Sequence, residues 1–233
     1  MSEYTDDSVV IKGKNLTRRF QRGKNEVVLA LNDTDIEIQK GKLTMIFGPS
    51  GSGKSTLLNV LSGLDRPDEG RVIFDNVNIV DWDEERLSNW RRTVVGFVFQ
   101  SFELIPNLTA LENAMLPLYP SEMKTNEIRI EALSLLKQVG VFETVNERAR
   151  RLSGGEQQRV AIARALITKP KIIFADEPTG QIDEDTGRKV MDLLRRQTRG
   201  HDRAVVVVTH NKDLERYADT VFEMRSGKLT KIK

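Results

Sequence analysis

The residues with the clearest chemical purpose form one glycine-rich run that fits the pattern G-x-x-x-x-G-K-[ST]. In order they are Gly48, Pro49, Ser50, Gly51, Ser52, Gly53, Lys54, Ser55 and Thr56. Glycines let backbone N–H groups approach phosphate oxygens with no Cβ in the way, and a following helix N-terminus adds unpaired donors and partial positive charge. We expect Lys54 to reach the β- and γ-phosphates of a nucleotide and Ser55 to place its hydroxyl on Mg²⁺.

The segments on either side of this run have the local structure that phosphate binding requires. Residues 43–47 predict a buried strand, and residues 57–61 predict the first turns of a helix. A strand, a glycine-rich turn and a helix start together form a phosphate cradle, so this context argues against a chance match to the pattern.

A pair of carboxylates ends a second apolar run. Residues 171–177 predict a buried strand that finishes in Asp176 and Glu177. Asp176 could belong to the coordination shell of Mg²⁺, and Glu177 could orient or deprotonate an attacking water. Such a pair is weak evidence alone, but in a chain with a phosphate-binding loop it predicts a hydrolytic site.

Two further polar residues follow apolar strands. Gln100 comes after the run 94–99, and His210 comes after the run 204–209. Open α/β sheets bind ligands outside the carboxyl ends of their strands, so we expect both side chains near Asp176. The Gln100 amide could ligate Mg²⁺ or orient a water, although its position alone favours a residue that caps the strand. His210 could act at the γ-phosphate.

A helix start provides a second possible anion site. Ser153, Gly154, Gly155 and Glu156 open a long helix, and Ser153 with Glu156 fits a capping box. A well-capped helix explains those two residues but not the glycine pair, which costs backbone entropy. The glycines at a helix N-terminus therefore suggest a second phosphate-type site, and hence a shared ligand.

Strand patterns near the N-terminus predict a small antiparallel sheet laid against the nucleotide-binding core. The expected strands are 9–20, 27–31 and 36–38, with a basic turn at 18–24. Phe20 falls in this turn, where its ring could stack on a purine base. It could equally be a core phenylalanine, and position alone favours neither interpretation.

The middle of the chain has a different character. Strand patterning disappears between residues 101 and 151, which predicts a helical insertion in the α/β core. The helices expected in this insertion are 109–116, 126–139 and 143–151.

Composition limits the classes of protein to which the chain could belong. Its 233 residues include 36 Lys and Arg against 34 Asp and Glu, a near balance that does not suggest a nucleic-acid partner. There is no cysteine, which excludes disulfides and Cys-ligated zinc. No apolar run approaches the roughly 18 residues of a membrane span, and the polar start does not resemble a signal peptide. We therefore expect a cytosolic chain.

The order of these motifs resembles the ATP-binding subunits of ABC transporters. The resemblance covers almost the whole chain, and the run 152–156 is close to diagnostic. It implies a P-loop NTPase core of the α/β class with an N-terminal antiparallel β subdomain and an inserted α-helical subdomain. It also implies one domain over 1–233, with 1–100 and 160–233 as the core and 101–159 as the helical subdomain.

The resemblance implies ATP and Mg²⁺ as ligands and assigns a role to each candidate residue. Phe20 is similar to the adenine-stacking residue, although tyrosine is commoner there, and Gln100 to the switch residue that ligates Mg²⁺ and senses a membrane partner. Glu177 is similar to the catalytic base and His210 to the residue that holds the γ-phosphate.

The same resemblance implies a second copy of the chain. Ser153, Gly154 and Gly155 would bind the γ-phosphate held by the other subunit, and Asp183 would contact the dimer partner. Two ATP molecules would then lie between the subunits of a head-to-tail dimer.

Within the family, the runs 95–100, 104–109 and 176–180 are similar to the lipoprotein-releasing and macrolide-exporting subgroup. This implies an integral-membrane permease as partner, a lipoprotein, peptide or antibiotic-like substrate, and a place on the inner face of the cell membrane. A cell-division ATPase that signals through a similar permease is the alternative. DNA-repair and chromosome-structure ATPases would need a coiled-coil or zinc-bearing insertion, and translation-factor ATPases usually carry two cassettes.

Overall fold

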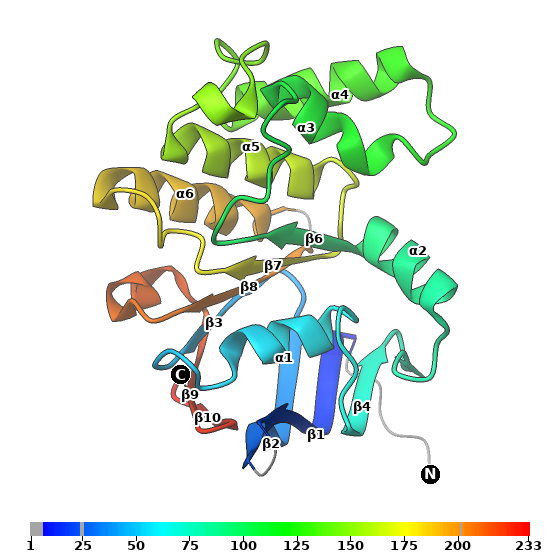
Figure 1. The fold of residues 1–233 in the computed structure, drawn as a ribbon, viewed down its shortest axis with the longest axis vertical. Helices are drawn as coiled ribbons and strands as arrows, with labels where there is room; N and C mark the ends of the chain where they lie inside the picture. Colours follow the sequence, from blue (N-terminus) through cyan, green and yellow to red (C-terminus); the bar gives the residue numbers. More distant parts are fainter. Residues whose placement is uncertain (1–6, 24–25, 201) are drawn as a thin grey trace.

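Two β-sheets and a group of helices make up the fold (Figure 1). The structure, a computed structural model, describes residues 7–23, 26–200 and 202–233. The larger sheet has the strand order β10-β9-β3-β8-β7-β6 and is parallel except for β10. Its strands are β3 (Leu43–Phe47), β6 (Val95–Val98), β7 (Ile172–Asp176), β8 (Ala204–Thr209), β9 (Thr220–Arg225) and β10 (Lys228–Lys231).

The central strands are mostly apolar because both faces of the sheet are covered. Every residue of β3 and β8 is buried, as expected for a parallel sheet between two layers. One face packs against α5 (Gly154–Leu166) and α6 (Glu184–Gln197), and the other packs against α1 (Lys54–Leu61). The carboxyl ends of these strands carry the candidate site.

The smaller sheet is antiparallel and lies on the far side of α1 (Figure 1). Its order is β2-β1-β4-β5. The strands are β1 (Val9–Arg22), β2 (Glu26–Gln39), β4 (Glu69–Phe74) and β5 (Val77–Asn78). Leucine and valine side chains of α1 are buried between the two sheets, so α1 belongs to the cores of both.

The prediction of two separate strands at 27–31 and 36–38 is wrong, because β2 runs through both. Asp33 and Asn15 both adopt left-handed backbone conformations, and the Asn15 side-chain amide donates to the Asp33 carboxylate over 2.8 Å. A bulge at these residues therefore lets one strand continue through the gap between the two predicted strands. Because Phe20 pairs with Val28 in the extended ladder, its predicted place in a turn is also wrong.

Most helices gather above the larger sheet (Figure 1). They include α3 (Ala110–Met115) and α4 (Thr125–Gln138), which pack with α5, while α2 (Glu84–Val94) precedes β6. Short 3₁₀ helices are η1 (Leu116–Leu118), η2 (Ala149–Arg151) and η3 (Lys212–Tyr217).

The helix predicted at 143–151 is wrong except for the single turn of η2. The backbone carbonyls of Glu147 and Val145 accept from the N–H groups of Ala110 and Leu111, at 2.9 and 3.0 Å. These bonds satisfy donors at the start of α3 that have no partner within that helix. Tertiary pairing thus takes the carbonyls that a local helix would have used.

No helix in the described part of the chain has the length and apolar character needed to span a bilayer.

Candidate active site

The glycine-rich loop connects β3 to α1 and curls around one lysine side chain. The Lys54 ammonium donates to the carbonyls of Gly48 and Pro49, at 2.9 and 3.0 Å. A Cβ at Gly53, whose φ is +107°, would lie 2.1 Å from the Ala30 carbonyl oxygen, so only glycine fits there. The loop is therefore fixed with Lys54 at its centre and with the N-terminus of α1 open toward it.

A cavity of about 480 Å³ lies over this loop. Its walls include residues 48–52, His210 after β8, Lys212 at the start of η3, and the ion pair of Glu223 with Arg225 on β9. The hydroxyl of Ser52 is buried inside the loop and has no partner among the described residues. Backbone donors, cations and a spare hydroxyl form a donor set that suits a polyphosphate.

Asp176, at the carboxyl end of β7, reaches the start of α1. The Ser55 side chain is near enough to favour the ionised form of the Asp176 carboxyl. Burial raises the pKa of the Asp176 carboxyl, and the charge of Glu177 raises it further, against the lowering effects of Ser55 and Lys54. Desolvation disfavours the ionised carboxylate, so a cation placed beside it would be stabilising.

We expect Asp176→Asn to raise the melting temperature at neutral pH in the absence of nucleotide and divalent metal. The folded state raises the pKa of Asp176, so the protonated carboxyl contributes to the stability of the fold. This contribution is complete below the ordinary pKa of 3.8 and is lost as the pH rises through the pKa of the folded state. The neutral amide avoids that loss. Thermal unfolding from pH 4 to pH 8 in EDTA should show a gain that shrinks toward low pH.

The matched control is Asp183→Asn, which should have the opposite sign. Hydrogen bonds from the Thr186 side chain and backbone lower the pKa of Asp183, so its ionised form stabilises the fold at neutral pH. An Asp176→Asn variant that melts lower than the parent at pH 8 would contradict a desolvated carboxylate at this position.

Glu177 is held in one orientation by two neighbours on the β8 side. Thr209 Oγ1 donates to Glu177 Oε2 at 3.0 Å, and His210 Nδ1 lies 2.8 Å from Oε1. The backbone of Glu177 is left-handed, with φ +45°, and its N–H donates to the Val208 carbonyl at 2.9 Å. A non-glycine residue in this conformation is strained and is often found at functional sites.

Gln100 follows β6, and its side chain lies against the loop after Glu177. A Cβ at Gly180 would lie 3.1 Å from Gln100 Nε2. The same loop is held from α5 by Gln158, a fully buried residue whose Nε2 donates to the Pro178 carbonyl at 2.7 Å. Sequence reasoning missed both Gln158 and Thr209, although Gln158 stands three residues after the glycine pair that drew attention to α5.

The start of α5 contributes none of residues 153–155 to the lining of the cavity over the phosphate-binding loop. Ser153 caps α5, and its Oγ and N–H lie 2.6 and 2.9 Å from Glu156 Oε2, which completes the predicted capping box. A Cβ at Gly155 would lie 2.5 Å from Thr186 Cγ2. Close packing against α6 therefore accounts for Gly155, a reason that the sequence did not supply.

Two remaining candidates occupy exposed positions. Asp183 caps α6 by accepting from the Thr186 N–H at 3.0 Å. Phe20 is 40% exposed on β1, with the Arg18 guanidinium 4.8 Å from the centre of its ring. Of the two interpretations left open for Phe20, the structure therefore excludes a core phenylalanine.

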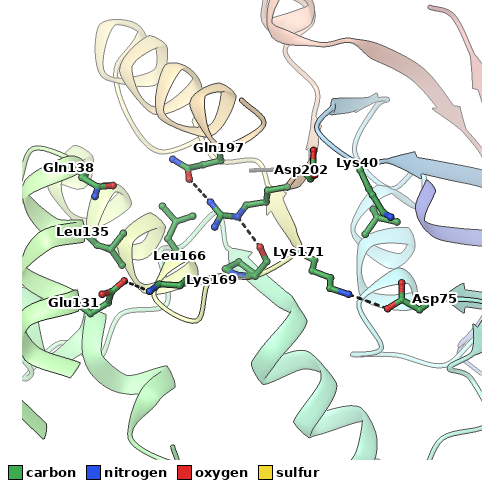
Figure 2. A pocket seen from close by; sticks show the side chains of 13 residues that line it. Lys40, Asp75, Glu131, Leu135, Gln138, Leu166, Lys169, Lys171, Gln197 and Asp202 are labelled. Atoms are coloured by element: carbon green, nitrogen blue, oxygen red, sulfur yellow. Dashed lines mark hydrogen bonds and ion pairs between the residues drawn. The ribbon is translucent and has the colours of Figure 1, made fainter. Parts of the chain in front are cut away.

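A second cavity, of about 620 Å³, lies at the opposite ends of the strands (Figure 2). Most of the charged side chains in its walls form ion pairs with each other. Lys169 pairs with Glu131 at 3.0 Å and Lys171 with Asp75 at 3.2 Å. The first pair joins the loop before β7 to α4, and the second joins the start of β7 to the turn between β4 and β5. Although this cavity is the larger, its paired charges do not form a convergent donor set, so the smaller cavity is the better active-site candidate.

A P-loop, a strand that ends in two carboxylates and an inserted helical segment define a P-loop ATPase of the cassette type. The family model described as ABC transporter matches residues 31–180. The chain therefore belongs to the ABC transporter family, and it is an ATPase of that family.

Known relatives match over nearly the full length. The chain is 46% identical to "Uncharacterized ABC transporter ATP-binding protein MJ0796" of Methanocaldococcus jannaschii, over 94% of this chain and 95% of that protein. It is 38% identical to "Lipoprotein-releasing system ATP-binding protein LolD" of Syntrophus aciditrophicus, over 94% and 98% of the two chains.

Solved structures agree with this assignment. The structure titled "Dimeric Structure of MJ0796, a Bacterial ABC Transporter Cassette" superposes with a TM-score of 0.88 at 44% identity, covering 96% of this chain and 99% of that one. A second MJ0796 dimer, described as a post-hydrolysis state bound to ADP and Pi, has the same TM-score at 43% identity and the same coverage of both chains.

Proposed function

We propose that this ATPase dimerises head to tail around two ATP molecules and powers an integral-membrane permease. One observation carries the proposal: Ser153, Gly154 and Gly155 open α5 but contribute nothing to the lining of the cavity over the phosphate-binding loop of their own chain. Two half-sites of this kind are completed when a second copy supplies the missing half. A relative of this chain has been solved as a dimer, which supports the arrangement.

We assign nucleotide binding to the loop 48–56 and its surroundings. Lys54 would bind the β- and γ-phosphate oxygens in place of the loop carbonyls that it now contacts. Phe20, exposed on β1, would stack on adenine. Within the described residues no cluster of three or more His, Cys, Asp or Glu could hold a metal alone. Mg²⁺ would therefore depend on Ser55, Gln100, Asp176 and phosphate oxygens, and it would neutralise charge on those oxygens.

Hydrolysis would use groups at the carboxyl ends of β7 and β8. Glu177 would take a proton from the attacking water, because its carboxylate is already oriented by Thr209 and His210. His210 would also contact the γ-phosphate. From the second copy, Ser153, Gly154 and Gly155 would bind that phosphate through backbone N–H groups, and Asp183 would contact the partner.

The whole chain, residues 1–233, would act as a single cassette. Residues 1–100 and 160–233 would form the catalytic core with its antiparallel sheet, and residues 101–159 the helical subdomain. The assembly would lie on the cytoplasmic face of the membrane, bound there through its permease.

The cargo that we propose is a lipoprotein, a peptide or an antibiotic-like molecule. The proposal rests on the motif similarities and on the printed names of several relatives, which describe lipoprotein-releasing ATP-binding proteins. A cell-division type of cassette that signals through its permease without transport is the second candidate. Identification of the permease that co-purifies with the chain would separate the two.

Contact with the permease is expected along residues 102–120. Within this segment Phe102 and Met115 are buried, and Leu104 packs partly against the core. A charge at Leu104 would therefore disturb the fold as well as any contact with the permease. Ile105 is 46% exposed, while its backbone N–H and carbonyl are both bound by the buried side chain of Asn113. An exposed apolar side chain on a fixed backbone suits a groove for a permease helix.

We expect Ile105→Glu to weaken stimulation by the permease while leaving basal hydrolysis unchanged. Burial of an unpaired carboxylate in an apolar groove should raise the permease concentration needed for half-maximal stimulation at least about tenfold. The matched control is Ile130→Glu on α4, where the side chain is 68% exposed. ATPase rates with reconstituted permease test this, and normal stimulation of the Ile105 variant would place the groove elsewhere.

A further inference from the structure

One partly buried arginine joins the last turn of α5 to the loop that follows Gln100. Arg164 Nη2 donates to the Phe102 carbonyl at 2.8 Å, and Nη1 donates to the Glu103 carbonyl. Burial lowers the pKa of this guanidinium, and the charge of Glu103 only partly opposes that effect. Taking a guanidinium out of water costs free energy, which its hydrogen bonds to these two carbonyls offset.

The two carbonyls belong to consecutive residues with strained backbones. Phe102 and Glu103 have φ angles of +61° and +49°, a left-handed backbone conformation that residues other than glycine rarely adopt. Each such residue costs on the order of 1 kcal/mol or more and persists only where its surroundings enforce it. Arg164 binds both carbonyls, so it fixes the turn of the chain at Phe102 and Glu103, directly after Gln100 and Ser101. We call this turn the Phe102 corner.

The same corner touches the other end of α5. A Cβ at Gly154 would lie 3.7 Å from Phe102 Cζ, and the Phe102 side chain is 9% exposed. Helical side chains lean toward the N-terminus, so Arg164 reaches back along α5 to meet Phe102. Phe102 thus lies along α5, between the glycine segment (residues 153–155) at the start of the helix and Arg164 at its end.

We propose that Arg164 is a positioning residue that sets the place of Gln100 and links it to the glycine segment of the same subunit. A shift of α5, caused by nucleotide bound against Gly154 and Gly155, would move the Phe102 corner through Arg164 and so move Gln100. The two ATP sites of the dimer would then be coupled, because Gln100 and the glycine segment serve different nucleotides. This inference rests on the proposed role of Gln100 and on the proposed dimer.

The test replaces the guanidinium with side chains of similar length. Arg164→Met keeps the aliphatic stem but removes every donor, whereas Arg164→Lys keeps the charge and can bind one carbonyl. We expect Arg164→Met to lower kcat about tenfold or more, with the KM for ATP changed by less than about threefold, and Arg164→Lys to recover part of kcat. A loss of mere packing would not be rescued by lysine.

The matched control is Arg203→Met. Arg203 is also partly buried, and it donates from Nε to the Pro170 carbonyl at 2.8 Å and from Nη1 to Gln197 at 2.6 Å. It lines the second cavity, to which Gln100 contributes nothing. We expect Arg203→Met to lower the melting temperature without the selective fall in kcat.

A double-mutant cycle separates this inference from the role of Gln100. If Arg164 acts through Gln100, Arg164→Met should have little further effect on kcat in a Gln100→Ala background. If Gln100→Ala impairs turnover and the effect of Arg164→Met is the same in both backgrounds, Arg164 does not act through Gln100 and the inference is overturned. If Gln100→Ala leaves turnover intact, the proposed role of Gln100 is itself wrong. Should Arg164→Met not fold, the same comparison with Arg164→Lys decides the matter.

Discussion

Replacing Glu177 with glutamine should slow ATP hydrolysis by about 10²- to 10⁴-fold, the range that general-base catalysis contributes, while ATP still binds. Glutamine keeps the size of the side chain and can still accept from Thr209, but its amide cannot take a proton from water. Because the ATP bound between the subunits would no longer be hydrolysed, the variant should accumulate as a dimer in the presence of ATP.

Single-turnover hydrolysis and sedimentation with ATP measure the two parts of this result. The matched control is Glu223→Gln, since Glu223 also lines the cavity over the phosphate-binding loop but pairs with Arg225 instead of facing the β7 end. The control should retain turnover. A Glu177 variant that stays monomeric with ATP, or keeps full turnover, would remove Glu177 from the role of base.

Replacing Lys54 with alanine should lower ATP affinity at least about tenfold and abolish nearly all turnover. Each charge-assisted hydrogen bond to phosphate is worth roughly 1.5–3 kcal/mol, and Lys54 is the cation at the centre of the loop. The ammonium also binds the Gly48 and Pro49 carbonyls, so its loss loosens the loop itself. Both effects act in the same direction.

Equilibrium binding of a fluorescent ATP analogue, together with the ATPase rate, gives the measurement. Lys212→Ala is the control, because Lys212 lines the same cavity but is exposed and carries no bond to the loop. Its charge is screened by water, and we expect a change in affinity of less than about threefold. Wild-type activity in the Lys54 variant would refute the assignment of the loop.

Much of the fold follows from the sequence where local patterns and mechanism agree. The strand before the loop and the strand that ends at Asp176 are apolar because both faces of the sheet are buried, and the structure has them as β3 and β7. The α5 start was also predictable, since Ser153 and Glu156 form their capping box within four residues of chain. Such features depend on neighbours in sequence.

Features that depend on distant partners escaped the sequence. The segment 143–151 has helical character, but its carbonyls pair with the start of α3. The strand β2 continues through a bulge that its pairing with β1 stabilises, together with bonds from Asn32 and Thr34 to the Gly227 carbonyl. In the site, Thr209 and Gln158 act through contacts 32 and 20 residues away along the chain, and no spacing rule points to either.

The central claim is that each ATP site is shared between two copies of this chain, and mixing two inactive variants tests it most directly. Ser153→Arg blocks the glycine segment of its own subunit, and Lys54→Ala removes the phosphate-binding lysine of its own. Each variant alone should be nearly inactive. A mixed dimer retains one intact site, formed by the wild-type loop of the first chain and the wild-type glycine segment of the second, so mixing should restore part of the ATPase rate. If no activity returns although mixed dimers are demonstrated, each subunit acts alone and the shared site is wrong.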